Sequence, residues 1–228
     1  MAKKNWKLET APDLYVGQPD LHFFDLMIPL AMRFNKAVAT RTFKGSLTEI
    51  QLAAVEIAPG GFNLCLSIRE LIRSGYLFAG EILLRPLLER VAVLSYLHKN
   101  QNTGLQLWRD GWPHKSRPSI KTMIKFIEEP PRTLGDDQYP SDYSVHDLLL
   151  ERVDHLNRLV HADPIGAYRN TVFDIERGRA VHLSGPNFKN PAYCGEIAMT
   201  ANALMCSLIQ VVGAIFPEAT STKNSETH

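Results

Sequence analysis

Four polar residues between positions 154 and 161 have the types and spacing of a site for proton and phosphate chemistry. Their spacing of i, i+3, i+4 and i+7 places them on one stripe of a helix: Asp154, Asn157, Arg158 and His161. An imidazole moves protons near neutral pH, and a guanidinium holds phosphate. We therefore expect catalytic roles for His161, Arg158 and Asp154. We expect Asn157 to bind, and a solvated face with an Asp–Arg pair is the alternative.

A second polar set lies in a segment that is otherwise apolar. Glu81, Arg85 and Glu89 are four residues apart, which aligns them along one side of a helix. Buried charges must be paired, so we expect these residues to pair with each other or with a neighbouring helix. Arg69 and Arg73 are the candidate partners on the preceding helix. The set forms either a buried ion network that fixes helix register or a binding pocket.

Histidine and glutamate spacing also allows a metal-site hypothesis. Glu151 and His155 are four residues apart, and further ligand types lie in other predicted helices: Glu56, Glu81, Glu89 and His98. Helical bundles build di-metal sites from Glu-x-x-His pairs, a spacing that does not occur on two helices here. The sequence also lacks a phosphate loop, a dinucleotide-binding glycine motif, an HExxH motif and a GxSxG elbow. We therefore expect neither a metal nor another cofactor.

Composition places the chain among ordinary globular proteins. Its 228 residues include 45% hydrophobic and 21% charged residues, and the formal net charge is +1. These values exclude a disordered or collagen-like chain, and the balance of charge disfavours a protein that mainly coats nucleic acid. The cysteines Cys65, Cys194 and Cys206 form no CxxC pair. This pattern indicates reduced thiols and a cytoplasmic location.

Apolar residues at helical spacing predict an all-α fold. We expect a first helix from an Asp20 N-cap to about Thr40. A second begins at a Ser46 N-cap, with Glu49 completing a capping box, and ends near Ser74. The Pro-Gly-Gly sequence at 59–61 should kink this second helix or split it in two.

The segment from Tyr76 to His98 is apolar on nearly every side, which is typical of a helix surrounded by others. We therefore place it at the centre of a bundle. Further helices are expected over 108–112, 120–128, 145–162 and 192–216, and a weak hairpin over 171–175 and 179–183. The predicted core face of the 145–162 helix consists of Leu149, Val153, Leu156 and Val160.

The segment from Ile197 to Pro217 contains no charged residue and is about as long as a membrane span. Its polar residues disfavour insertion into lipid, so we expect a buried core helix and no membrane association. The elements together predict a single-domain, up-and-down bundle of about six helices around a central apolar helix. We expect residues 1–18 to form an N-terminal arm, 19–217 the helical bundle domain and 218–228 a flexible tail.

Several short motifs in a fixed order resemble a protein family. They are LIRSGY at 71–76, RPLLE at 85–89, LNRLVH at 156–161 and SGP at 184–186. Over about residues 47–215 the chain resembles uncharacterised all-helical bacterial proteins in which an R-x-x-x-E helix precedes an L-x-x-x-V-H helix. Those proteins are distantly similar to the HEPN superfamily, of the abortive-infection type. The resemblance implies a helical, usually dimeric protein and ribonuclease activity in toxin–antitoxin or phage-defence systems.

The HEPN catalytic motif is an arginine, four to six residues, and then a histidine on one helix. Arg158 and His161 do not fit that spacing, whereas Arg109 to His114 and Arg177 to His182 each enclose four residues. We expect a homodimeric effector that binds or cleaves RNA without a metal, since the 2′-hydroxyl of RNA is itself a nucleophile. The alternatives are a non-catalytic dimerisation or interaction module with a partner protein, and a helical metal-dependent enzyme.

Overall fold

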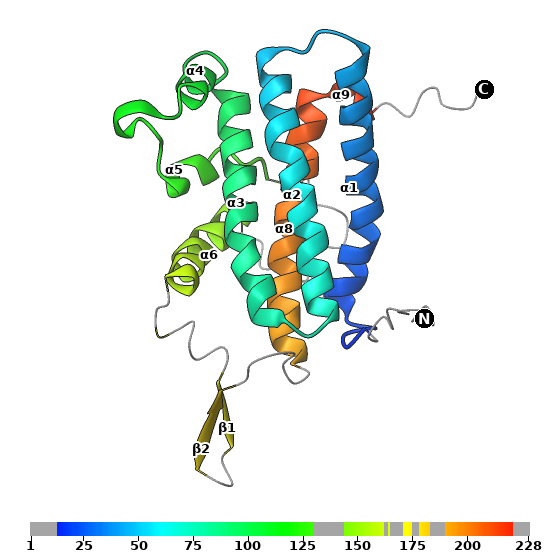
Figure 1. The fold of residues 1–228 in the computed structure, drawn as a ribbon, viewed down its shortest axis with the longest axis vertical. Helices are drawn as coiled ribbons and strands as arrows, with labels where there is room; N and C mark the ends of the chain where they lie inside the picture. Colours follow the sequence, from blue (N-terminus) through cyan, green and yellow to red (C-terminus); the bar gives the residue numbers. More distant parts are fainter. Residues whose placement is uncertain are drawn as a thin grey trace, which may run out of the picture.

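The residues that the computed structural model describes are 13–129, 144–161, 164, 171–174, 178–182 and 190–220, and they form an all-α helical bundle (Figure 1). Its long helices are α1 (Pro19–Lys44), α2 (Glu49–Arg73), α3 (Leu77–Lys99) and α8 (Pro191–Ile215). The short helices are α4 (Thr103–Arg109), η1 (Pro113–Lys115), α5 (Ile120–Ile124), α6 (Val145–Val160) and α9 (Pro217–Thr220). The antiparallel strands β1 (Thr171–Asp174) and β2 (Arg179–His182) confirm the expected hairpin.

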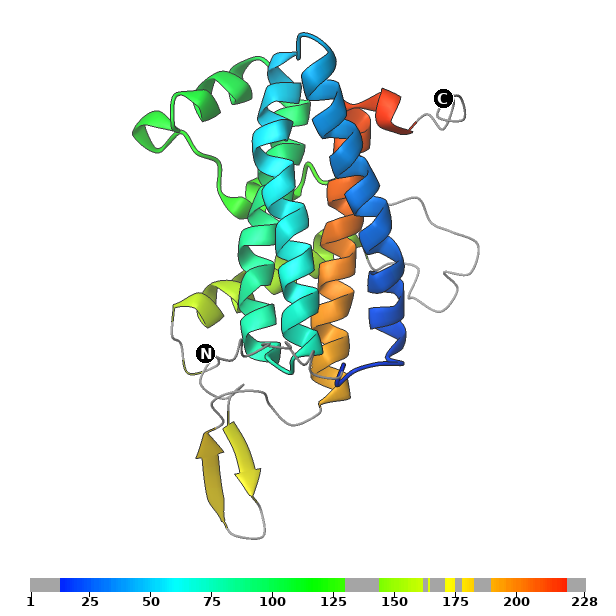
Figure 2. The ribbon, with the colours of Figure 1, turned by 45° about the vertical axis from the view of Figure 1, so that its right-hand side comes forward.

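Helix α3 lies at the centre of the bundle, as its composition predicts. It packs against α2 and α8 on one side and against α4, α5 and α6 on the other (Figures 1 and 2). Its buried side chains come from successive turns and include Leu84, Leu88, Val91 and Leu94. Burying one such side chain contributes about 1.5–3 kcal/mol. A helix that is apolar on all sides is therefore stable where neighbours enclose it.

The directions of the long helices determine which helix ends lie together. Helices α1, α3 and α8 run in one direction and α2 runs in the other (Figure 1). Helices α1, α2 and α3 are thus antiparallel to their neighbours in the chain, as in an up-and-down bundle. At one end, Gln18 donates a hydrogen bond of 3.1 Å to the carbonyl of Pro191. At the opposite end, Arg41 of α1 pairs with Glu218 of α9 at 3.0 Å.

The start of α1 differs from the expected cap. The helix begins at Pro19 after Gln18, so Asp20 lies in the first turn instead of at the N-cap. Proline suits this position because its fixed φ is helical and the N–H that it lacks would have no helical partner. At the far end of α2, Gly75 adopts a φ of +82°, which confirms it as the stop between α2 and α3.

Helix α2 has a capping box, two residues later than expected. The Thr48 hydroxyl accepts from the Gln51 backbone N–H, and the Gln51 side chain accepts from the Thr48 N–H. The predicted pair of Ser46 and Glu49 is therefore wrong. Both pairs fit the sequence pattern of a capping box, so the pattern alone does not choose between them.

Helix α2 continues through Pro59, Gly60 and Gly61, so of the two expected outcomes, a kink or a split into two helices, the split does not occur. A Cβ at Gly60 would lie 2.8 Å from Cζ of Arg90 in α3. A Cβ at Gly61 would lie 2.6 Å from Cδ2 of Leu208 in α8. The two glycines therefore allow α3 and α8 to approach α2 closely, and this packing offsets the hydrogen bond that Pro59 cannot donate.

The buried face of α6 is rotated from the predicted one. It consists of Leu148, Leu149, Val153, Leu156 and Leu159. Val160, a predicted core residue, is 41% exposed. At about 100° per residue, the observed face has His155 at one edge and Asn157 at the other. This rotation decides which polar side chains of α6 meet α3.

The short helices also differ from the predicted ones. The helix predicted over 120–128 ends at Ile124. The one predicted over 108–112 is replaced by α4, which ends at Arg109, and by η1. Between them the backbone enters the left-handed region, where Trp112 has a φ of +57°. A helix cannot continue through such a residue.

Helix α8 is enclosed by α1, α2 and α3, as its charge-free stretch from Ile197 onward predicts. Helices α2 and α8 are both long and apolar enough to cross a membrane by length and composition, which is weak evidence on its own. In the most apolar 18-residue stretch of α8, 61% of the residues are buried inside the bundle. Packing against three helices accounts for that apolar composition.

Parts of both predicted end segments contact the bundle. Tyr15, in the predicted arm, is fully buried, and its hydroxyl accepts a hydrogen bond of 3.1 Å from the backbone of Asn190. The backbone N–H of Leu14 donates to the carbonyl of Arg73 at 3.3 Å. Residues 218–220, in the predicted tail, lie in α9.

Candidate functional site

A buried carboxylate joins three helices at the centre of the molecule. Glu81 of α3 is 1% exposed. Its Oε1 lies 2.8 Å from Nε2 of His155 in α6, and its Oε2 accepts a hydrogen bond of 2.5 Å from the hydroxyl of Tyr193 in α8. Tyr193 is itself buried, whereas the His155 side chain is 21% exposed. The imidazole therefore connects a buried acid to the protein surface.

One turn along α3, a guanidinium meets α6 again. Nε of Arg85 donates a hydrogen bond of 2.7 Å to Oδ1 of Asn157. Nη1 of Arg85 lies 3.5 Å from Oε2 of Glu89, and Arg117 forms an ion pair with the other oxygen of Glu89. Burial, together with the charge of Arg117, lowers the pKa of Arg85. The polar residues of α3 thus form one continuous row.

The row of α3 meets α6 at both edges of the buried face of α6. Glu81 and Arg85 are one turn apart on α3, and their partners His155 and Asn157 occupy the two edges of the buried face of α6. We call these four residues the acid–base centre. The expected pairing within α3 is found between Arg85 and Glu89, and the expected pairing with a neighbouring helix is found with α6.

The arginines of α2 are not the partners of this row. Arg69 instead pairs with Asp25, and its second carboxylate partner is Asp13 at 2.5 Å. Arg73 pairs with Glu70 one turn before it on α2. The expectation that Arg69 and Arg73 balance the charges of α3 is therefore wrong. Arg69 thus holds the N-terminal turn and α1 against α2.

The four residues of the predicted α6 stripe do not lie on one common surface in the structure. Asn157 faces α3 and contacts Arg85. Asp154 is exposed and forms an ion pair of 2.7 Å with Lys121. Arg158 and His161 are also exposed, and His161 is the C-cap of the helix. The stripe is therefore not one surface, because Asn157 lies at the edge of the buried face and the other three lie outside it.

Three partners of the polar row were not assigned to a site by sequence reasoning. His155 entered only the metal-site hypothesis, where it was paired with Glu151. Tyr193 and Arg117 carried no signal, because each lies in a different helix or loop from its partner. Within the described residues, no group of three or more histidine, cysteine and acidic side chains is placed to hold a metal.

The HEPN-type spacings do not lie on single helices in the structure. Arg109 ends α4 and pairs with Glu49 at 2.6 Å, whereas His114 lies in η1 with a φ of +50°. His182 ends strand β2, and Arg177 lies outside the described residues. Neither pair therefore forms the helical motif.

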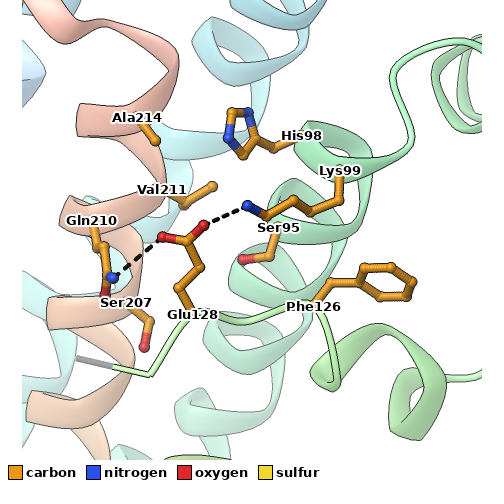
Figure 3. A pocket seen from close by; sticks show the side chains of 9 residues that line it. All are labelled: Ser95, His98, Lys99, Phe126, Glu128, Ser207, Gln210, Val211 and Ala214. Atoms are coloured by element: carbon orange, nitrogen blue, oxygen red, sulfur yellow. Dashed lines mark hydrogen bonds and ion pairs between the residues drawn. The ribbon is translucent and has the colours of Figure 1, made fainter. Parts of the chain in front are cut away.

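A small cavity between α3 and α8 is lined by His98, Ser95 and Ser207 among others (Figure 3). Its volume of about 10 Å³ admits a water molecule at most. At its mouth Glu128 pairs with Lys99 at 2.5 Å. Burial, with the Lys99 charge, lowers the pKa of His98. This cavity is too small to be a ligand site.

No family model, curated protein or solved structure matches the chain.

Proposed function

We propose that this chain is a HEPN-like RNA-cleaving protein of a bacterial defence or toxin system and that the acid–base centre carries the reaction. The supporting observation is the hydrogen bond between the buried Glu81 carboxylate and His155, one turn from Arg85 and Asn157. A carboxylate behind an imidazole fixes its tautomer and stabilises its protonated form. An adjacent guanidinium supplies the phosphate contact.

The tautomer follows from the hydrogen bond. With Nε2–H donating to Glu81, Nδ1 of His155 carries the lone pair, and it has no hydrogen-bond partner within the described residues. We assign Nδ1 as the proton acceptor for a ribose 2′-hydroxyl. The 2′-oxygen then attacks phosphorus, the bond to the 5′-oxygen breaks, and the imidazolium returns the proton to that oxygen. The products are a 2′,3′-cyclic phosphate and a 5′-hydroxyl.

Arg85 is suited to hold the phosphate during this step. Its Nη1 is buried and has no hydrogen-bond partner within the described part of the chain, although it lies 3.5 Å from Glu89. A buried donor without an acceptor costs about 1–3 kcal/mol. A phosphate oxygen would relieve that cost if Arg85 turned toward it.

The test compares two histidines of the same helix. We expect His155→Gln to abolish cleavage of single-stranded RNA, because a glutamine amide can still donate to Glu81 but cannot exchange a proton at neutral pH. His161→Gln is the matched control and should retain activity. Circular dichroism melts of both variants establish that they are folded. Loss of cleavage in His161→Gln with full activity in His155→Gln would instead support the role that the sequence suggests for His161.

Variants of the acid–base centre should also distinguish RNA binding from RNA cleavage. Arg85→Gln should weaken RNA binding in a salt-dependent manner, whereas His155→Gln should leave binding intact. A wild-type protein that neither binds nor cleaves RNA would refute the proposal.

We propose homodimerisation as the second function, and exposed apolar side chains favour it. Phe23 and Leu26 of α1 are 46% and 61% exposed, and Met199 of the adjacent α8 is 37% exposed. A second copy of the chain would remove these side chains from water. Light scattering should give twice the chain mass for the wild type and a monomer for Leu26→Glu. A monomeric wild type would exclude this assembly.

A further inference from the structure

A second polar site adjoins the acid–base centre at Glu89, which lines it and pairs with Arg85. A cleft of about 500 Å³ opens between α2, α3 and the α4–η1 segment, and its lining includes Glu56, Arg90, Trp108 and Trp112. Small-molecule sites generally have volumes of about 300–1,000 Å³. The cleft therefore has room for a ligand of modest size.

A cation without a partner lines this cleft. The guanidinium of Arg90 occupies the space that a side chain at Gly60 would fill, since a Cβ there would lie 2.8 Å from Nη1 and Cζ. Nε of Arg90 is buried without a hydrogen bond, and the described residues provide no ion pair for this guanidinium. A positive charge at that place is available to an anionic group.

A carboxylate without a partner lies beside it. Glu56 precedes Gly60 by one turn of α2, so its side chain starts from the same face of the helix. Glu56 is exposed and has neither an ion pair nor a hydrogen bond within the described residues. The other two charges of the lining, Glu89 and Arg117, are already paired with each other. The cleft thus presents one available cation and one available anion.

Two half-buried tryptophans complete the lining. Trp108 belongs to α4, and the ring of Trp112 packs at 6.2 Å from that of Tyr96. Trp112, His114 and Lys115 have φ values of +57°, +50° and +62°. Residues other than glycine adopt such values at a cost, and these conformations cluster at ligand sites. Here the costly segment is the one that carries Trp112 to the cleft.

We propose that the cleft binds a free α-amino acid with a large apolar side chain. The carboxylate of the ligand binds Arg90, its ammonium group binds Glu56, and its side chain packs against the two tryptophans. A zwitterion fits better than an anion or a cation because each available charge of the cleft has the opposite sign to one end of the ligand. This site is separate from the acid–base centre, and the proposal does not rest on RNA cleavage.

The test titrates the full chain with L-phenylalanine and follows tryptophan fluorescence. A Trp6→Phe background leaves Trp108 and Trp112 as the tryptophans of the chain. We expect saturable binding of phenylalanine. Phenylalaninamide lacks the carboxylate and 3-phenylpropionate lacks the ammonium group, so each should bind about tenfold or more weakly. Glycine, without an apolar side chain, should not bind at millimolar concentration.

Two variants test which residue binds each end of the ligand. In Arg90→Gln, phenylalanine and phenylalaninamide should bind equally weakly. In Glu56→Gln, which is an exposed change that folding tolerates, phenylalanine should lose its advantage over 3-phenylpropionate. Arg109→Gln removes a nearby charge outside the cleft and should change nothing. Absence of saturable binding to the wild type, or Glu56→Gln with unchanged selectivity, would overturn the proposal.

Discussion

The substitution Glu81→Gln tests whether the buried row stabilises the protein. Within the described residues, the carboxylate hydrogen-bonds to His155 and to the hydroxyl of the buried Tyr193. A glutamine is neutral and has one acceptor oxygen, so the hydrogen bonds that these two groups make to a charged carboxylate are lost or replaced by weaker neutral ones. A hydrogen bond to a charged group contributes about 1.5–3 kcal/mol. We take about 2 kcal/mol as the expected loss in the free energy of unfolding.

Urea unfolding measures this loss directly. With a slope of about 2 kcal/mol/M, a destabilisation of about 2 kcal/mol lowers the midpoint by about 1 M. Glu70→Gln is the matched control, since Glu70 is exposed and pairs with Arg73 at the surface of α2. That variant should unfold at the wild-type midpoint. Equal midpoints for Glu81→Gln and the wild type would refute the view that the row holds α6 and α8 on α3.

Three further results are expected. Burial lowers the pKa of His98 below its ordinary 6.5, so unfolding takes up a proton between the lowered value and pH 6.5. Stability should therefore rise with pH across that window, and His98→Gln should flatten the slope measured by urea unfolding at pH 5–7. Gly61→Ala should cost about 1–3 kcal/mol by forcing a Cβ against Leu208, and Leu208→Ala should restore part of it if the contact is the cause. Burial raises the pKa of Cys65 and of Cys194 to about 12, so iodoacetamide should label neither thiol at neutral pH until urea unfolds the chain.

The central helix could be predicted because its signal is local. A segment with leucine, isoleucine or valine on every side has no stable position in water, whatever the rest of the fold is. The all-α class and the hairpin over 171–182 follow from similarly local patterns. The capping box of α2 shows the limit, because Ser46 and Thr48 are both adequate caps and the difference between them depends on the turn that α1 imposes.

The acid–base centre could be predicted only in part. Spacing alone aligned Glu81, Arg85 and Glu89, but their partners depend on how α6 is rotated about its axis. That rotation follows from burying Leu159 instead of Val160, a choice between two apolar neighbours that tertiary packing makes. Leu149, Val153 and Leu156 belong to both the predicted and the observed face, and burying Leu148 and Leu159 extends that face to His155.

The placement of the charges on α3 also constrains the order in which the site can form. When α3 packs against α2 alone, Glu81 has neither His155 nor Tyr193, because both arrive from helices later in the chain. An unpaired carboxylate in an apolar setting is costly, so the α2–α3 pair gains stability when α6 and α8 dock. Docking at any other rotation would bury the charge without its partners. We therefore expect the contacts that align the imidazole also to favour the native register of α6 on α3.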